Sequence, residues 1–205
     1  MEWSDIIRRA GFTPPFFNHN GGLEFHHLSL KDTLSLTRAM QKNQKHLEAF
    51  LPMFHRQETK NVAHVQRWIR SMLEEAYPAQ HFVFTYQNKL CGFASTLPIS
   101  ENPREVQLRY MVFEGFTGQG LATRIATTLE LYAFNVWGYD RIFIEMDSHN
   151  RASMRVAQKL DYEFQGTREY EITGTQGTGF WYSYVKERPR APSAQLSQDS
   201  ICDPC

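Results

Sequence analysis

The chain has 205 residues, of which 41% are hydrophobic and 21% charged, a balance typical of a folded globule and not of a disordered chain. Lysine and arginine together number 22, as do aspartate and glutamate, so the formal net charge is zero. A neutral chain lacks the overall positive field that drives binding to nucleic acid or anionic membranes, and neither is expected as a partner.

The first half of the chain begins with a short strand and continues with helices. Residues 23–28 alternate as in a strand, and apolar positions from Lys31 onward suit a short helix. A second helix is expected from His46 to Leu51. The clearest amphipathic helix is predicted between a capping Thr59 and Pro78, because its apolar residues recur at three- and four-residue spacing.

The pattern then changes to the period of two that is typical of strands. Residues 81–86 and 90–95 flank a short turn containing asparagine, which predicts a β-hairpin, and residues 106–113 form a third strand. These three strands form a meander of neighbouring antiparallel strands.

In the second half, helices and strands alternate. We expect helices over 118–136 and 151–160, and strands over 141–146, 162–172 and 180–186. A meander followed by a strand–helix–strand unit implies one mixed sheet with helices on its faces, an α/β or α+β fold.

The folded part is expected to end near Arg188. Residues 1–188 are predicted to form a single domain, and the polar, proline-containing residues 189–205 a disordered tail. The tail contains Cys202 and Cys205, which with Cys91 make three cysteines. This odd set, in a chain that starts without a signal-like segment, indicates a cytoplasmic setting.

The most informative stretch is 112–123, where a strand leads into a turn with Gly118 and Gly120 and then directly into a helix. Unpaired amides at a helix N-terminus, together with the positive end of the helix dipole, favour phosphate oxygens, and a pyrophosphate is the natural ligand. Taken alone, the two glycines could equally well only make the turn.

Two common nucleotide motifs do not fit this stretch. A P-loop needs lysine and then serine or threonine at the helix start, where this chain has Leu121 and Ala122. A dinucleotide fingerprint needs a third glycine, and Thr123 occupies that position.

Residues 112–122 instead resemble the acetyl-CoA-binding segment of the GNAT acetyltransferases, whose signature is Gln/Arg-x-x-Gly-x-Gly/Ala after a hydrophobic strand. Gly118, Gly120 and Ala122 fit that signature. Thr117 stands where the family usually has glutamine or arginine, so one side chain that faces the diphosphate is shortened.

The resemblance extends to the RimJ/RimL-like branch of ribosomal-protein N-acetyltransferases. Asn150-Arg-Ala-Ser153, the run 156–162 and Gly166 are similar to that branch, as is the early segment 46–52. The resemblance covers roughly residues 23–186. It implies a mixed, mostly antiparallel sheet that splays in the middle with helices on both faces, acetyl-CoA as co-substrate, and no metal; the spacing of His, Cys and Asp gives no metal-ligand cluster either.

The same resemblance assigns the residues that bind the cofactor. Met111 and Val112 would supply backbone hydrogen bonds to the pantetheine arm, the glycine turn would hold the phosphates, and the motif asparagine would be either a cofactor partner or a helix cap. The cofactor residues expected on this basis are Met111, Val112, Thr117, Gly118, Gln119, Gly120, Leu121, Ala122 and Asn150.

Catalysis needs a base for the amine and an acid for the departing thiolate. Many family members carry a tyrosine seven residues after the motif asparagine as the acid, but here that position is Ala157. The resemblance therefore points to Ser153 as the acid, and a helix-start role is its alternative. For the base, Glu171 is the first choice over Glu169, although both could be a surface pair.

The resemblance thus implies an acetyl-CoA-dependent N-acetyltransferase acting on a primary amine, with a protein N-terminal α-amine as the preferred acceptor. Alternatives are a small amine such as an antibiotic, a polyamine or an amino-acid derivative, and a non-catalytic acyl-CoA-binding module. An acidic acceptor groove would favour cationic small molecules or basic protein tails. The protein is expected to be a monomer or homodimer.

Overall fold

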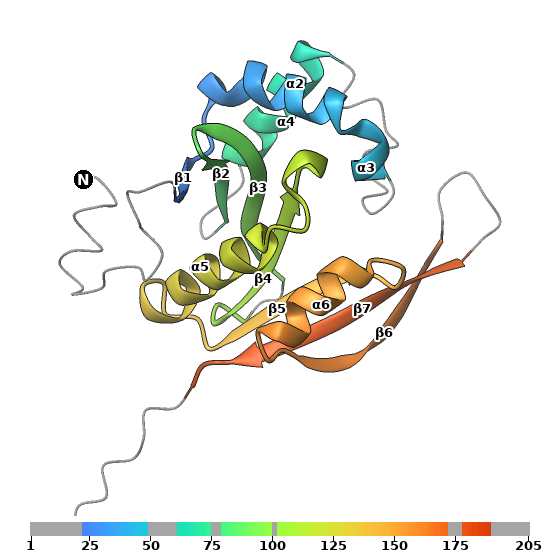
Figure 1. Cartoon of the computed structure of the whole chain (residues 1–205). Coiled ribbons are helices and arrows are strands. Elements are labelled where there is room, and N and C mark those ends of the chain that lie inside the picture. Colours follow the sequence, from blue (N-terminus) through green and yellow to red (C-terminus); the bar gives the residue numbers. More distant parts are fainter. Residues whose placement is uncertain (1–21, 49–60, 75–78, 100–101, 172–177, 190–205) are drawn as a thin grey trace, which may run out of the picture.

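The computed structural model describes residues 22–48, 61–74, 79–99, 102–171 and 178–189. Within these ranges the chain folds around one seven-stranded sheet with the strand order β1-β2-β3-β4-β5-β7-β6 (Figure 1). The strands are β1 (Leu23–His27), β2 (Gln80–Tyr86), β3 (Lys89–Pro98), β4 (Glu105–Val112), β5 (Arg141–Asp147), β6 (Glu163–Glu171) and β7 (Thr178–Glu187). The helices are α2 (Thr33–Lys42), α3 (Gln44–Glu48), α4 (Val62–Glu74), α5 (Leu121–Asn135) and α6 (Arg151–Lys159), with single 3₁₀ turns at Leu30–Asp32 and Glu114–Phe116.

Every neighbouring pair of these strands is antiparallel except β4 and β5, which run parallel. Their register covers only Glu105–Gln107 against Arg141–Phe143, although both strands continue well beyond it. The sheet therefore opens between β4 and β5 after a short paired segment. This arrangement confirms the predicted mixed, mostly antiparallel sheet that splays in the middle.

The helices lie on both faces of the sheet and enclose two hydrophobic cores. On one face, α5 packs over Phe82, Phe84 and Leu108 through residues such as Ile125 and Leu129. On the other face, α2 and α4 cover a different set of side chains, which includes Leu28, Val83, Phe93 and Phe113. Because successive strand residues point to opposite faces, the expected period of two places Phe82 and Val83 in different cores.

The predicted elements are found with small shifts at their ends. The helix expected from residue 118 begins at Leu121, because Gly118 and Gly120 have φ angles of 74° and 73°. These values lie in the left-handed region that glycine tolerates best, so both residues belong to a turn before the helix. Three expected features lie outside the described residues: the Thr59 cap, residues 49–51 of the helix expected from His46 to Leu51, and residues 190–205 of the tail.

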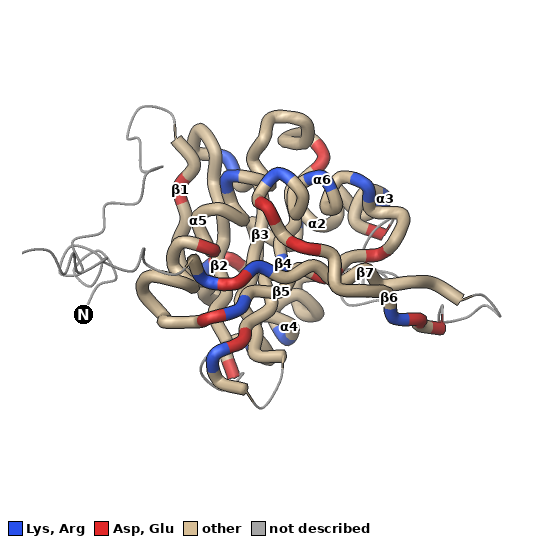
Figure 2. Tube along the Cα trace, turned by 90° about the horizontal axis from the view of Figure 1, so that it is seen from below, with Lys and Arg blue, Asp and Glu red and all other residues tan. Residues whose placement is uncertain are grey.

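The described helices include none with the length and apolar character needed to cross a membrane. Charged residues of both signs are interspersed along the described elements (Figure 2). This distribution agrees with the neutral composition of the chain.

Candidate active site

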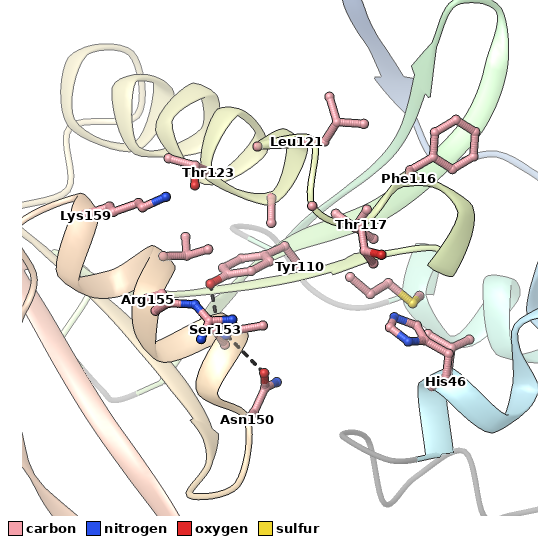
Figure 3. Close-up of a pocket in the computed structure, with 18 residues that line it drawn as sticks. His46, Tyr110, Phe116, Thr117, Leu121, Thr123, Asn150, Ser153, Arg155 and Lys159 are labelled. Atoms are coloured by element: carbon pink, nitrogen blue, oxygen red, sulfur yellow. Dashed lines mark hydrogen bonds between the residues drawn. The ribbon is translucent and has the colours of Figure 1, made fainter.

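A first cavity, of about 270 Å³, lies between the end of β4, the N-terminus of α5, one face of α6 and the helix α3 (Figure 3). It opens beside the part of β4 that no longer pairs with β5. Backbone groups alternate in direction along a strand, so Val112 turns its N–H and C=O toward this open side, whereas the Met111 carbonyl faces Gly92 on β3. The residues that line it are His46, Leu47, Tyr110, Met111, Val112, Phe116, Thr117, Gly118, Gly120, Leu121, Ala122, Thr123, Asn150, Ala152, Ser153, Arg155, Val156 and Lys159.

The turn that precedes α5 is held in place by its own polar contacts. The backbone N–H of Glu114 donates to Oδ1 of Asn43 at 2.7 Å, which ties the 3₁₀ turn to the end of α2. The Thr117 hydroxyl donates to the Glu114 carbonyl at 2.8 Å. The Thr117 side chain thus stabilises the turn itself, and the N-terminus of α5 faces the cavity with backbone amides.

Among the described residues, the lysine and arginine side chains that line this cavity both come from α6. Arg155 and Lys159 are exposed and four residues apart, so they share one face of the helix and border the cavity opposite the glycine turn (Figure 3). The guanidinium of Arg155 and the ammonium of Lys159, across the cavity from the N-terminus of α5, suit an anionic ligand with several phosphates. Sequence reasoning missed this pair, although its i, i+4 spacing could have indicated it.

A second cavity, of about 310 Å³, lies on the face of the sheet that α4 covers. Its walls combine aliphatic, polar and aromatic side chains; the aromatic ones include Trp181 on β7 and the pair Trp68 and Phe93, whose ring centroids are 5.3 Å apart. Of the described residues, three with charged side chains border it: Arg109, Glu145 and Arg168. Among the described residues, this cavity therefore has two arginines to one carboxylate, which does not match the acidic groove expected for cationic small molecules or basic protein tails.

Polar side chains in this second cavity form a chain of contacts across the splayed strands. Gln107 on β4 donates through Nε2 to Oε2 of Glu145 on β5 at 2.8 Å, and Arg109 donates through Nε to Oε1 of Gln107 at 2.8 Å. Arg168 Nη2 lies 3.9 Å from Glu145 Oε2. The Glu145 side chain is 30% exposed, so one partly accessible carboxylate faces the cavity.

Four residues line both cavities: Tyr110, Met111, Asn150 and Ser153. The hydroxyl oxygens of Tyr110 and Ser153 are 2.9 Å apart at this junction (Figure 3). Burial raises the pKa of Tyr110 to about 12, with the Ser153 hydrogen bond opposing the rise. Tyr110 therefore remains a neutral phenol, and both hydroxyls retain a proton near neutral pH.

The turn that positions Ser153 is fixed by Asn150 and Asp147. Asn150 caps α6, since its Oδ1 accepts from the Ser153 N–H at 3.0 Å. Asp147 accepts from the backbone N–H and Nδ1 of His149 at 2.7 and 2.9 Å, and from the Tyr170 hydroxyl on β6. Burial would raise the pKa of Asp147, but these hydrogen bonds outweigh it and the pKa lies below its ordinary value.

Most of the residues proposed from the sequence come together here. All the expected cofactor residues line the first cavity except Gln119, whose side chain donates back to the Gly115 carbonyl at 3.3 Å. Ser153 lies at the junction, and its backbone N–H is also the capped group of α6. Glu171 is exposed at the end of β6 and lines neither cavity, and the residues that directly follow it lie outside the described ranges.

The sequence did not single out Tyr110 or Glu145. Both are ordinary strand residues, and neither belongs to a recognisable motif. Ala157 occupies the position expected for the tyrosine that acts as general acid in many enzymes of the family that the sequence resembles. It is fully buried in the core. In the described part of the chain no three His, Cys, Asp or Glu side chains gather as a metal site.

The chain is similar in sequence to known acetyltransferases. Residues 23–163 match the family model described as "Acetyltransferase (GNAT) domain". Spermidine N(1)-acetyltransferase of Escherichia coli strain K12 is 23% identical over 93 residues, which are 45% of this chain and 50% of that protein. The chain thus spans about half the length of the curated relatives it matches.

Solved structures of acetyltransferases share the fold over most of both chains. RimL, a ribosomal L7/L12 α-N-protein acetyltransferase in complex with coenzyme A, has a TM-score of 0.75 at 17% identity, over 84% of this chain and 97% of that one. The microcin C7 self-immunity acetyltransferase MccE, in complex with acetyl-CoA and AMP, has a TM-score of 0.73 at 18% identity, over 85% and 97%.

Proposed function

The chain belongs to the GNAT acetyltransferase family, and from that premise we propose that it transfers an acetyl group from acetyl-CoA to the α-amine of a protein N-terminus. The observation that carries this proposal is the pair of cavities that meet at Tyr110, Met111, Asn150 and Ser153. One cavity has the features of a site for a phosphorylated cofactor, and the other is of a size for an amine and its first neighbouring groups. Because they share one junction, a donor and an acceptor held in them would meet there.

In the first cavity, the chain would bind acetyl-CoA mainly through its backbone. The α5 N-terminus and the turn of Gly118 and Gly120 would receive the pyrophosphate, and the unpaired backbone of Val112 on β4 would hydrogen-bond the pantetheine arm. The Met111 backbone, which the sequence resemblance also assigned to this arm, faces β3. Arg155 and Lys159 would neutralise phosphate charge from the opposite side. These two cations offset the short side chain at Thr117, which is committed to its own turn.

In the second cavity, Glu145 is the carboxylate placed to accept a proton from the acceptor amine. It is held by Gln107 Nε2 and remains partly exposed to the cavity. A bound ammonium must lose a proton before its nitrogen attacks the thioester, and a nearby carboxylate, directly or through a water, serves that step. Glu171 remains an alternative base as proposed from the sequence, although it lines neither cavity.

Charge in the second cavity favours an N-terminal α-amine over a polyamine. Two of its three charged side chains among the described residues are arginines, Arg109 and Arg168, so a chain of several ammonium groups would meet repulsion there. A peptide N-terminus brings one ammonium and polar amide groups, which suit a wall of mixed apolar and polar side chains. The solved ribosomal-protein acetyltransferase with the same fold agrees with this preference.

The alternative acceptor is a small amine, and the partial match to a spermidine acetyltransferase is the observation that favours it. The match covers 93 residues, so it does not reach both cavities in full. The proposal also includes a cytoplasmic setting and a ribosomal protein as substrate. The activity of RimL on ribosomal L7/L12 supports the choice of substrate.

Two measurements test the proposal. Thiol release from acetyl-CoA is followed with peptides that carry free N-termini, with spermidine, and without acceptor. We expect release with peptides to exceed release with spermidine by at least an order of magnitude. Mass spectrometry of protein N-termini from cells with and without the gene then identifies the acceptor. Faster turnover of spermidine, or an unchanged set of acetylated N-termini, would contradict the α-amine assignment.

A further inference from the structure

The two hydroxyls at the junction of the cavities come from different parts of the fold. Tyr110 lies on β4, three residues after the last pairing with β5, and Ser153 lies in the first turn of α6. Their oxygens are 2.9 Å apart, and both residues line the cofactor cavity and the acceptor cavity (Figure 3). A thioester whose acyl group reaches the acceptor must pass this pair.

Tyr110 is the better proton donor of the two. A phenol is far more acidic than an aliphatic alcohol, so Tyr110 gives up a proton at lower cost than Ser153 does. In return, the Ser153 hydroxyl can donate to the phenolic oxygen and stabilise negative charge that develops on it. Ser153 is itself fixed, since its backbone N–H is held by the Asn150 cap.

We propose that Tyr110 is a catalytic residue that protonates the departing thiolate, and that Ser153 supports it by donating to the phenolic oxygen. The inference rests on the proposed function, because it assumes that the thioester of acetyl-CoA lies at the junction. It shifts the acid role from Ser153, where the sequence resemblance placed it, to a residue that no motif marked. Ser153 becomes the positioning and stabilising partner.

The step balances in atoms and charge. The acceptor nitrogen forms a bond to the acetyl carbon, and the bond from that carbon to sulfur breaks. The phenolic proton passes to sulfur, and the phenolate regains a proton from those that the nitrogen has released. One thioester and one amine thereby give one amide and one thiol.

The environment of Tyr110 fits this role. Its raised pKa keeps the phenol protonated at the start of every turnover. A thiolate that forms in the same secluded place is also destabilised by loss of water, so its own affinity for a proton rises with that of the phenolate. Proton transfer therefore becomes favourable only as the carbon–sulfur bond breaks.

The first test removes single hydroxyls. Tyr110→Phe keeps the ring, and we expect it to lower kcat by about 100-fold, within the range for loss of a general acid, while the Kd for acetyl-CoA changes less than about twofold. Ser153→Ala should lower kcat less, and the double variant should resemble Tyr110→Phe because the two act as a unit. Tyr132→Phe, which removes a buried hydroxyl on α5 outside both cavities, is the matched control.

The second test changes acidity without removing the group. With 3,5-difluorotyrosine at position 110, the phenol is more acidic, and we expect the pH profile of kcat to acquire a falling basic limb below pH ~10 that the unsubstituted enzyme lacks, since only the protonated phenol is active. A purely structural hydroxyl would not move this limb. The proposal is overturned if the limb is absent, if Tyr110→Phe retains kcat within about threefold, or if kcat and the melting temperature fall while the Kd for acetyl-CoA rises in parallel.

The readout is thiol release from acetyl-CoA with whichever amine the unmodified enzyme accepts fastest, or slow hydrolysis by water when it accepts none. The thiolate departs in each case, so the test does not depend on the acceptor. An enzyme that uses spermidine in preference to peptides would contradict the proposed acceptor, and the same measurements would still decide the role of Tyr110.

Discussion

The two cavities that meet at Tyr110 and Ser153 are built in different ways. The first is made largely by one continuous stretch, from the end of β4 through the glycine turn into α5, with α6 closing it. The second takes side chains from α4, from five different strands and from the start of α6, which are far apart in the sequence. A site made of local backbone depends on a few residues with unusual conformations, and a site made of distant side chains depends on strand register.

This contrast predicts where single substitutions are most damaging. Gly120→Glu should raise the Kd for acetyl-CoA about a thousandfold, or ~4 kcal/mol, because it puts a side chain at a left-handed φ and a negative charge beside the pyrophosphate. Isothermal titration calorimetry measures the change. The control is Gly115→Glu, which adds the same charge in open space outside the cavity. Equal losses of acetyl-CoA affinity in the two variants would contradict the assignment of the turn as the phosphate site.

The acceptor side is tested by exchanging carboxylates for amides. Glu145→Gln should lower kcat/KM by about 100-fold near neutral pH, since the amide keeps the Gln107 contact as an acceptor but cannot take a proton. Glu171→Gln, the matched variant on β6, should change the same parameter less than about threefold. The two are compared by steady-state kinetics over a range of pH. The larger loss at Glu171 would assign the base to the end of β6 instead.

The same contrast explains how much the sequence could predict. Gly118, Gly120 and Asn150 have conformations or caps that depend on neighbours only a few residues away, so the pattern of residues identified them and the element boundaries around them. Tyr110 and Glu145 become functional candidates only because β4 and β5 pair over three residues and then separate. That separation is a property of the assembled sheet. The alternation of apolar and polar residues along a single strand does not predict it.

Thr117 and Gln119 show what a motif position could not predict. Motif position assigns both to the cofactor, yet their side chains donate to the carbonyls of Glu114 and Gly115 within the turn. Motif position located the turn correctly. It could not tell a side chain that faces the ligand from one that stabilises the loop, because the competing carbonyl groups are set by the 3₁₀ turn before it.

Charge on α6 provides a weaker test of the cofactor side. Arg155→Ala and Lys159→Ala should each raise the KM for acetyl-CoA about fivefold, or ~1 kcal/mol, since an exposed charge contributes little through solvent. The effect should shrink at high ionic strength. Arg151→Ala, at an exposed position of the same helix that does not line the cavity, is the control. An unchanged KM in all three would leave phosphate binding to the backbone alone.

The smallest expected effect on turnover is at Asp147, which holds the turn before α6 but lines neither cavity. Burial raises its pKa, and the hydrogen bonds from Tyr170 and His149 lower it by more, so the net pKa in the folded chain is below the ordinary value. The stability that this ionised carboxylate provides is present above its unfolded pKa of about 3.9 and is lost as pH falls through the folded value.

Asp147→Asn should therefore reduce the free energy of unfolding at pH 7 by about 1–2 kcal/mol, and the difference from the unmodified chain should narrow as the pH falls below about 4. Urea denaturation at several pH values measures both. Asp140→Asn, which removes a carboxylate of lowered pKa from an exposed pair with Arg104, should cost less because water screens that pair. The difference in free energy of unfolding between Asp147→Asn and the unmodified chain is the decisive quantity. If it persists undiminished at pH ~3, below the ordinary pKa of an aspartate, the contacts of Asp147 with Tyr170 and His149 stabilise the fold through packing and not through charge.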